Sequence, residues 1–261
     1  MSESILLDVD GAVARITLNR PEAANGLTLE MARELMQAAI RADEDPGVRA
    51  IVLTGAGKLF CAGGDLKSFA GHGDGVGALL KEITAYLHAA ISRLTRGDAP
   101  VVCAVNGTAA GAGMSLAVAS DLTIAAESAK FTMAYTAAGL SPDGSSTWFL
   151  PRLIGMRRTQ ELMLTNRRLT AAEALEWGLV NRVVPDGEAL AQAEELARDL
   201  AAGPTRAHGV VKRLLASSMS ESLETQMEAE ATGIAGCAMT GDGREGIQAF
   251  LEKRKPAFSG R

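Results

Sequence analysis

The chain has few of the residues that metal sites, disulfides and nucleic-acid surfaces require. Its 261 residues include three cysteines and three histidines, and the formal net charge is -5. The cysteines form no CxxC pair and leave one thiol over, which is typical of reduced, buried thiols rather than a disulfide framework. The histidines lie far apart without metal-ligand spacing, which disfavours a zinc or iron site. The acidic balance disfavours nucleic acid as the main partner.

Long apolar runs and targeting signals are also lacking. Although 47% of the residues are hydrophobic, no stretch approaches the roughly 20 apolar residues that a membrane-spanning helix needs. The first residues contain no basic n-region, so the sequence predicts neither a signal peptide nor a transit peptide. We therefore expect a cytoplasmic protein without a membrane partner, long enough to bury a sizeable core.

Strand and helix patterns alternate over the first part of the chain, which predicts an α/β core. Two apolar runs on either side of Asp10-Gly11 indicate a β-hairpin, and Thr170 with Glu173 forms a capping box that begins a later helix. Short apolar runs bounded by turn residues predict buried strands at 49–55, 99–107 and 120–126. Apolar residues at helical spacing predict helices at 28–43 and 79–94.

The pattern changes after Pro185, where only helices are expected. These are predicted at 188–202, 205–217, 220–240 and 243–254. We therefore predict two domains, an α/β core over 1–187 that carries the functional site and a helical oligomerisation region over 188–261. Within the core, four glycines in 70–77 predict a mobile surface loop.

Two glycine-rich turns each follow an apolar strand: "FCAGGDLKSF" at 60–69 and "NGTAAGAG" at 106–113. Neither belongs to a phosphate-binding motif. A P-loop would need glycine at Val52 and Ser or Thr at Leu59, and a dinucleotide fingerprint would need a small residue at Leu116. The stretch "GLSPD" lacks the last glycine of a serine-hydrolase elbow. Taken singly, each turn is explained equally well by close packing of a strand on a helix.

Several stretches, in order and spanning nearly the whole chain, resemble the crotonase (enoyl-CoA hydratase/isomerase) superfamily. They are "FCAGGDLK", "VNGTAAGAGMSLAVASDLTIA", "SAKFTMAYTAAGLSPDGSSTWFLPRLIG", "ELMLTNRRLTAAEALEWGLVNRVV" and "FLEKRKPAF". The resemblance implies a spiral of ββα units with C-terminal helices, assembled as a homotrimer or a dimer of trimers. It also implies an acyl-CoA thioester substrate and no cofactor, since CoA is part of the substrate.

The resemblance assigns a role to the two turns. The backbone amides of Gly64 and Ala112 match the oxyanion hole that holds the thioester oxygen, and negative charge is also favoured where a helix begins near Ala112. Lys67 either reaches a CoA phosphate or is a solvated lysine on the first turn of a helix. Phe250 and Lys253 match a motif that contacts CoA bound to a neighbouring subunit. The full set assigned to substrate or CoA binding is Ala62, Asp65, Leu66, Lys67, Tyr135, Trp148, Phe250 and Lys253.

The acid/base residue distinguishes the possible reactions. Ser115 and Tyr135 stand where the hydratases of the family have glutamates, and neither hydroxyl is a general base near neutral pH. Asp143 stands where the double-bond isomerases of the family place their carboxylate, which moves a proton from C2 to C4 of a 3-enoyl-CoA. Local sequence alone favours Asp143 as an N-cap for the helix that follows it, and only its match to the family position favours catalysis. We therefore favour isomerase chemistry with Asp143 as the acid/base.

Other reactions stay open. Halobenzoyl-CoA dehalogenases of the same superfamily use an aspartate at the position of Asp143 as a nucleophile, a helix histidine that His88 matches, and a tryptophan where Tyr135 stands. His88 also falls on the polar side of its helix, which is typical of a surface histidine. Relatives that isomerise the ring of phenylacetyl-CoA derivatives carry the same aspartate. An enoyl-CoA hydratase and a protein that binds acyl-CoA without turning it over are the further alternatives.

Overall fold

A computed structural model describes residues 3–261 and has a six-stranded sheet at its centre. The strand order is β1-β2-β3-β4-β6-β9, with β1 and β2 antiparallel and each later neighbour parallel. The bounds are β1 Ile5–Asp10, β2 Val13–Leu18, β3 Ala50–Gly55, β4 Val101–Val105, β6 Leu122–Ala126 and β9 Arg182–Val184. The predicted hairpin is confirmed: Asp10 pairs with Val13, and Gly11 has a φ of 58°.

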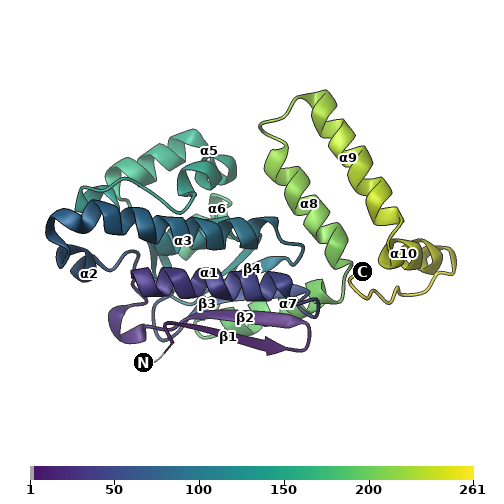
Figure 1. Ribbon diagram of the computed structural model, residues 1–261, viewed down its shortest axis with the longest axis horizontal. Coiled ribbons are helices and arrows are strands. Elements are labelled where there is room, and N and C mark those ends of the chain that lie inside the picture. The colour runs from purple at the N-terminus through teal and green to yellow at the C-terminus, as the bar shows by residue number, and fades with distance from the viewer. Residues whose placement is uncertain (1–2) are drawn as a thin grey trace.

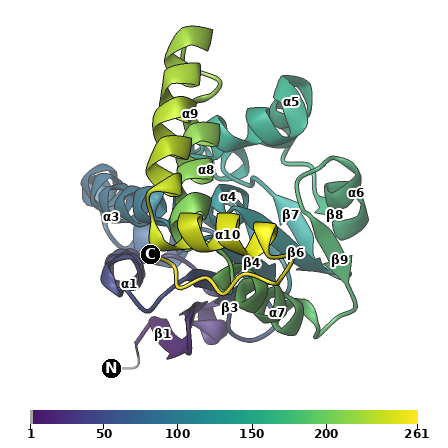
Figure 2. The same ribbon diagram turned by 90° about the vertical axis from the view of Figure 1, so that its right-hand side faces the viewer.

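Helices cover both faces of this sheet (Figures 1 and 2). They are α1 (Leu29–Glu44), α3 (Val76–Arg96) and α7 (Ala189–Ala201). Along β3, Ile51 and Leu53 belong to the apolar cluster that contains α1 and α3, whereas Val52 packs with Ala193 and Ala197 of α7. Burial on both faces explains why the strands are continuous apolar runs in the sequence. Helix α7 therefore packs on the sheet, and the division of the chain at residue 187 stays a prediction.

A smaller sheet and four helices complete this part of the molecule. The sheet has the order β5-β7-β8, with bounds Ala109–Ala110, Lys130–Thr132 and Leu169–Thr170. The helices are α2 (Leu66–Ala70), α4 (Ala112–Ala119), α5 (Ser146–Thr165) and α6 (Ala171–Glu176). The capping box of Thr170 and Glu173 is confirmed at the start of α6. In place of a long loop at 70–77, a 3-10 turn over Gly73–Gly75 leads directly into α3.

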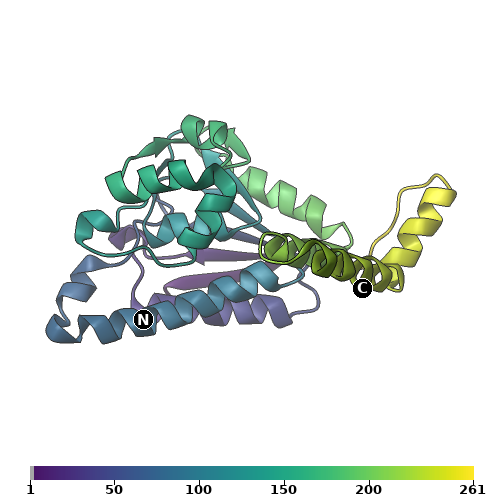
Figure 3. The same ribbon diagram turned by 90° about the horizontal axis from the view of Figure 1, so that it is seen from above.

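The last three helices project from the body of the protein (Figures 1 and 3). They are α8 (Thr205–Ser217), α9 (Leu223–Ala238) and α10 (Gly241–Leu251). Helix α9 buries none of its side chains, and Leu215, Ile234 and Phe250 are among the exposed apolar residues of this region. None of the helices in residues 3–261 combines the length and apolar character that a membrane-spanning helix requires.

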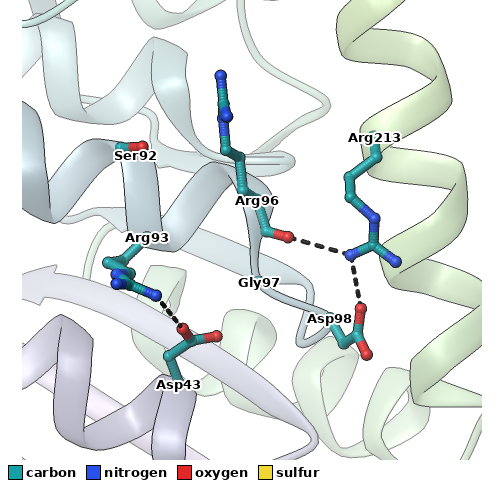
Figure 4. A pocket seen from close by; sticks show the side chains of 7 residues that line it. All are labelled: Asp43, Ser92, Arg93, Arg96, Gly97, Asp98 and Arg213. Atoms are coloured by element: carbon teal, nitrogen blue, oxygen red, sulfur yellow. Dashed lines mark hydrogen bonds and ion pairs between the residues drawn. The ribbon is translucent and has the colours of Figure 1, made fainter.

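Ion pairs and helix capping attach α8 to the body. A polar hollow of about 510 Å³ lies where α8 meets the ends of α1 and α3 (Figure 4). On one side of it Arg93 pairs with Asp43 at 3.4 Å. On the other side Arg213 donates to Asp98 at 2.7 Å and to the carbonyl oxygen of Arg96 at 3.1 Å, which caps the end of α3. None of the residues that line this hollow belongs to the glycine-rich turns, so the hollow and the candidate site are separate.

Candidate active site

The two glycine-rich turns lie against each other as one unit. The amide of Cys61 in the first turn donates to the carbonyl oxygen of Thr108 at 3.1 Å, and the amide of Ala110 donates back to the carbonyl oxygen of Cys61 at 2.8 Å. Each turn follows a parallel strand of the large sheet, β3 or β4, so both emerge at the same edge. The sheet therefore brings together two segments that are about 40 residues apart in the sequence.

Glycine is required where the two backbones touch. A Cβ atom on Gly113 would lie 2.4 Å from the carbonyl oxygen of Cys61, closer than any side chain allows. Gly63 has a φ of 98°, and its Cβ atom would lie 3.1 Å from the carbonyl oxygen of Ala110. Close packing, the simpler explanation of each turn, is therefore real, and it also fixes the directions of the neighbouring amides.

Two amides in this unit have no partner within the described chain. The amide of Gly63 donates to the sulfur of Cys61 and that of Asp65 to the carbonyl oxygen of Leu27, but the Gly64 amide between them donates to no atom of residues 3–261. Ala112 is the first residue of α4, where amides lack helical acceptors, and its amide is likewise unpaired among these residues. Both predicted oxyanion donors are thus available, in a site where partial positive charge from α4 accumulates.

Asn25 supports the first turn, and sequence reasoning did not identify it. Its side chain is fully buried, and Nδ2 donates to three backbone carbonyl oxygens at 2.9 to 3.0 Å, those of Ala56, Leu59 and Phe60. Its oxygen Oδ1 accepts from the amide of Arg20 at 2.8 Å. In the sequence "PEAANG" this asparagine is indistinguishable from an ordinary turn residue, because the three carbonyl oxygens that it binds lie on a distant segment.

The stretch predicted to line the CoA site begins α2. Asp65 is the N-cap, with Oδ1 accepting from the Ser68 amide at 3.1 Å, and its Oδ2 pairs with Arg20 at 3.1 Å. Although burial acts in the opposite direction, these two hydrogen bonds hold the pKa of Asp65 below its ordinary value. The Asp65 carboxylate is thus used by the fold. Ala62, Leu66 and Lys67 are exposed beside it.

The three residues predicted at the acid/base positions come together in space. Tyr135 donates from its phenol oxygen to Oδ1 of Asp143 at 2.5 Å. The hydroxyl of Ser115, on α4, lies 3.2 Å from that phenol oxygen and donates to the backbone carbonyl oxygen of Asp143 at 3.0 Å. The N-cap interpretation of Asp143 is wrong: α5 begins after Ser145, which caps it without a side-chain hydrogen bond, and the Asp143 carboxylate is held by Tyr135 instead.

The backbone that carries Asp143 is held from two sides. Gly144 has a φ of 60°, and a Cβ atom on it would lie 2.7 Å from Cβ of Ser115, so the turn passes directly over α4. From α3, Nε2 of His88 accepts a hydrogen bond from the Gly144 amide at 3.2 Å. Although His88 is exposed, as expected for the polar side of its helix, it is also a contact of the site.

The phenol of Tyr135 is a neutral hydrogen-bond donor. Burial, followed by the nearby negative charge of Asp143, raises the pKa of this phenol far above its ordinary value. On α5, which follows Asp143, Trp148 and Phe149 form an edge-to-face pair with ring centroids 4.6 Å apart. Trp148 also lies under the guanidinium of Arg152 at 3.9 Å and is 36% exposed.

Two predicted CoA contacts lie far from this site within one chain. Phe250 of α10 is 82% exposed, and Lys253 follows the end of the same helix. Figures 1 and 3 place α10 at the opposite end of the long axis from α2. Within residues 3–261, no group of three His, Cys, Asp or Glu side chains is arranged to hold a metal ion.

Comparison with known proteins agrees with the geometry. A family model described as enoyl-CoA hydratase/isomerase matches residues 8–261. The 1,2-epoxyphenylacetyl-CoA isomerase of Escherichia coli (strain K12) is 40% identical over 262 residues, covering 100% of both chains. The 4-chlorobenzoyl coenzyme A dehalogenase-2 of an Arthrobacter species is 39% identical over 223 residues, covering 85% of this chain and 81% of the relative.

A solved structure extends the similarity to three dimensions. The enoyl-CoA hydratase from Bacillus anthracis superposes with a TM-score of 0.92 at 36% identity, covering 99% of this chain and 100% of that one. The predicted α/β crotonase-type fold with a C-terminal helical region is therefore confirmed. Because the family model and these relatives match along nearly the whole chain, the protein belongs to the enoyl-CoA hydratase/isomerase family.

Proposed function

We propose that this protein is an acyl-CoA isomerase in which Asp143 moves a proton and the amides of Gly64 and Ala112 hold the thioester oxygen. In a 3-enoyl-CoA, Asp143 removes a proton from C2, the electron pair moves toward the thioester oxygen, and the same carboxyl group returns the proton at C4. The observation that carries this proposal is the composition of the acid/base cluster. It contains one carboxylate, Asp143, held by Tyr135 and Ser115.

The oxyanion turns supply the stabilisation that this reaction needs. Proton removal at C2 places negative charge on the thioester oxygen, and each preorganised amide aimed at such an oxygen is worth about 3 kcal/mol. The Gly64 and Ala112 amides are unpaired among the described residues, so a ligand can bind to them without breaking a hydrogen bond between those residues. No cofactor is needed beyond the CoA that the substrate carries.

Packing at Ser115 argues against a hydratase. Hydration uses one group to activate water and another to deliver a proton, and the matching positions hold the neutral hydroxyls of Ser115 and Tyr135. A Cβ atom added to Gly144 would lie 2.7 Å from Cβ of Ser115, so the turn bearing Asp143 passes close over position 115 and leaves little room for a longer side chain there. A turn that holds Asp143 in this place and a hydratase-type glutamate at position 115 therefore compete for the same space.

A second candidate substrate class is a ring-modified phenylacetyl-CoA. The whole-length similarity to the 1,2-epoxyphenylacetyl-CoA isomerase of E. coli favours it. The edge-to-face pair of Trp148 and Phe149 on α5 offers aromatic surface that suits a ring. Both candidates would use Asp143 and the same oxyanion turns, but they differ in the acyl group and in the bonds that rearrange.

Dehalogenation is not favoured, despite the similarity to the Arthrobacter dehalogenase. That chemistry would need Asp143 to attack an aromatic carbon with assistance from His88. Here Nε2 of His88 accepts from the Gly144 amide, so this nitrogen is used to support the backbone. The ring at position 135 is also a tyrosine, where the dehalogenases of the superfamily have a tryptophan.

We also propose that a second copy of the chain completes the CoA site. Phe250 and Lys253 cannot reach the α2 region of their own chain, from which α10 is separated by the length of the molecule (Figure 3). The exposed apolar side chains of α8, α9 and α10 suit burial against another copy. We therefore expect a homotrimer or a dimer of trimers, in which α10 of one copy contacts the CoA bound to the next and Lys67 contacts a CoA phosphate.

A panel of thioesters tests the proposed reaction. The purified protein is incubated separately with 3-hexenoyl-CoA, 2-hexenoyl-CoA, 1,2-epoxyphenylacetyl-CoA and 4-chlorobenzoyl-CoA, and the products are identified by mass spectrometry. We expect isomerised product from the first or the third ester, with little hydration of 2-hexenoyl-CoA and no chloride release. Efficient hydration or chloride release would contradict the assignment, and binding of every ester without turnover would indicate a non-catalytic protein.

A further inference from the structure

The Asp143 carboxylate has one oxygen that is anchored and one that is free. Oδ1 accepts the hydrogen bond from the Tyr135 phenol at 2.5 Å, a short distance typical of a bond to an ionised group. Oδ2 accepts from no atom of residues 3–261. One oxygen therefore fixes the orientation of the carboxylate, and the other keeps its lone pairs for a ligand.

The backbone of Tyr135 is held by hydrogen bonds at both its amide and its carbonyl oxygen. Its backbone amide donates to the carbonyl oxygen of Met133 at 2.7 Å, and its own carbonyl oxygen accepts from the amides of Ala138 and Leu140 at 3.0 Å. Ala134, just before it, has a φ of 53°, which is uncommon for a residue other than glycine. On this fixed backbone, the phenol oxygen lies between two polar partners, Oδ1 of Asp143 at 2.5 Å and the Ser115 hydroxyl at 3.2 Å.

Electrostatics determine which group donates the proton in this hydrogen bond. A donor aimed at a carboxylate stabilises its ionised form relative to the protonated form. The high pKa of the Tyr135 phenol, caused by burial and by the charge of Asp143, keeps the proton on tyrosine. The phenol therefore keeps its proton and acts as the hydrogen-bond donor to Oδ1 of Asp143.

We propose that Tyr135 is a positioning residue that binds Oδ1 of the Asp143 carboxyl group and leaves Oδ2 as the oxygen that takes the substrate proton. This rests on the proposed function, in which Asp143 is the base. The C2–H bond breaks as the Oδ2–H bond forms, and the electron pair of the C–H bond moves toward the thioester oxygen. The reverse transfer from Oδ2 at C4 completes the isomerisation, and the Tyr135 proton never leaves its oxygen.

The pH profile of proton exchange tests this role. We measure kcat/KM for deuterium incorporation from heavy water into the isomerised ester, for the native protein and for Tyr135→Phe. Because a hydrogen bond to a charged group contributes about 1.5–3 kcal/mol, the acidic limb of the profile should move upward by about one to two pH units in the variant. Tyr86→Phe removes the only other tyrosine hydroxyl of the chain and should leave the profile unchanged.

Fluorotyrosine gives a second readout that does not depend on a perturbed fold. In a Tyr86→Phe background, growth on 3-fluorotyrosine labels position 135 alone, because the chain has two tyrosines. The fluorinated phenol is a stronger donor, so the acidic limb should move to lower pH, opposite to the effect of Tyr135→Phe. His88 is the other titratable side chain at this turn, and His88→Gln should retain both shifts if they arise from the Tyr135–Asp143 pair.

The outcomes separate this role from the proposed function. The role of Tyr135 would be overturned if the acidic limb is unchanged in both the Tyr135→Phe and the fluorotyrosine proteins. If exchange is also lost in Asp143→Asn, Asp143 would remain the base. Exchange that persists in Asp143→Asn would instead overturn the proposed function. A fall in kcat/KM that is equal at every pH, without movement of the limb, would show that Tyr135 contributes only packing and would also overturn the proposal.

Discussion

Replacing Ser115 by glutamate tests whether a hydratase-type side chain can coexist with the turn that carries Asp143. Ser115 is 0% exposed, and its hydroxyl donates to the Asp143 carbonyl oxygen at 3.0 Å. Above it runs the backbone of Gly144, where even an added Cβ atom would lie 2.7 Å from Cβ of Ser115. A glutamate at 115 must therefore displace the turn over 143–145 or distort α4.

The size of the effect follows from these contacts. Loss of the Ser115 hydrogen bond costs about 1 kcal/mol, and overpacking of a buried position adds about 1–3 kcal/mol. A total of about 3 kcal/mol corresponds to a fall in Tm of roughly 6–12 °C for a chain of this length. Ser115→Ala, the matched control, loses the hydrogen bond alone and should fall by roughly 2–4 °C.

Calorimetry and a hydration assay with 2-hexenoyl-CoA measure both consequences. We expect Ser115→Glu to lose most of its isomerase activity, because Asp143 is displaced, and to gain no hydratase activity. A Ser115→Glu protein with the native Tm and rapid hydration would refute the reasoning, since it would show that the turn over 143–145 yields without cost.

Three further predictions concern the support of the site and of the C-terminal region. Asn25→Ala removes the donor of three backbone carbonyl oxygens and should lower the free energy of unfolding by about 3 kcal/mol in denaturant titrations. Gly113→Ala places a Cβ atom 2.4 Å from the Cys61 carbonyl oxygen, so acyl-CoA binding measured by calorimetry should be lost as the two turns separate. The Glu245 carboxylate accepts from Arg254, and this lowers its pKa from 4.5 to about 2. Because the pKa of this carboxylate is lower in the folded than in the unfolded chain, the interaction stabilises the fold fully above pH 4.5 and is lost as the carboxylate is protonated. The difference in Tm between the native protein and Glu245→Gln should therefore be largest above pH 4.5 and should close as the pH falls toward 2.

The fold was predictable where the sequence signal is local. The hairpin at Asp10-Gly11, the capping box of Thr170 and Glu173, and the helices of the C-terminal region depend on residues within one or two turns of each other, and all are confirmed. The apolar runs also predicted strands correctly, since burial on both faces removes the polar alternation. The expected loop at 70–77 was too long, because α2 extends to Ala70, a 3-10 turn spans Gly73–Gly75 and α3 begins at Val76.

Motif resemblance proposes Gly64, Ala112 and Asp143 as site residues, and their roles stay predictions. The contacts among the candidate residues were not predictable, because no local pattern indicates that Tyr135 donates to Asp143 or that His88 supports Gly144, which lie on different elements. The same reason explains the wrong N-cap interpretation of Asp143. An aspartate shortly before a helix suits a cap, and only the position of the Tyr135 phenol shows that its carboxylate is engaged elsewhere.

Deuterium exchange by Asp143→Asn tests the central claim most directly. The native protein, Asp143→Asn and the exposed control Asp199→Asn are incubated with 3-hexenoyl-CoA and with 1,2-epoxyphenylacetyl-CoA in heavy water, and label and product are followed by mass spectrometry. We predict isomerised product in the native and Asp199→Asn proteins, with label wherever the transferred proton exchanges with solvent. We predict at least a 100-fold loss in Asp143→Asn, as expected on removal of a general base. Isomerisation at the native rate in Asp143→Asn, with the fold intact, would contradict the account.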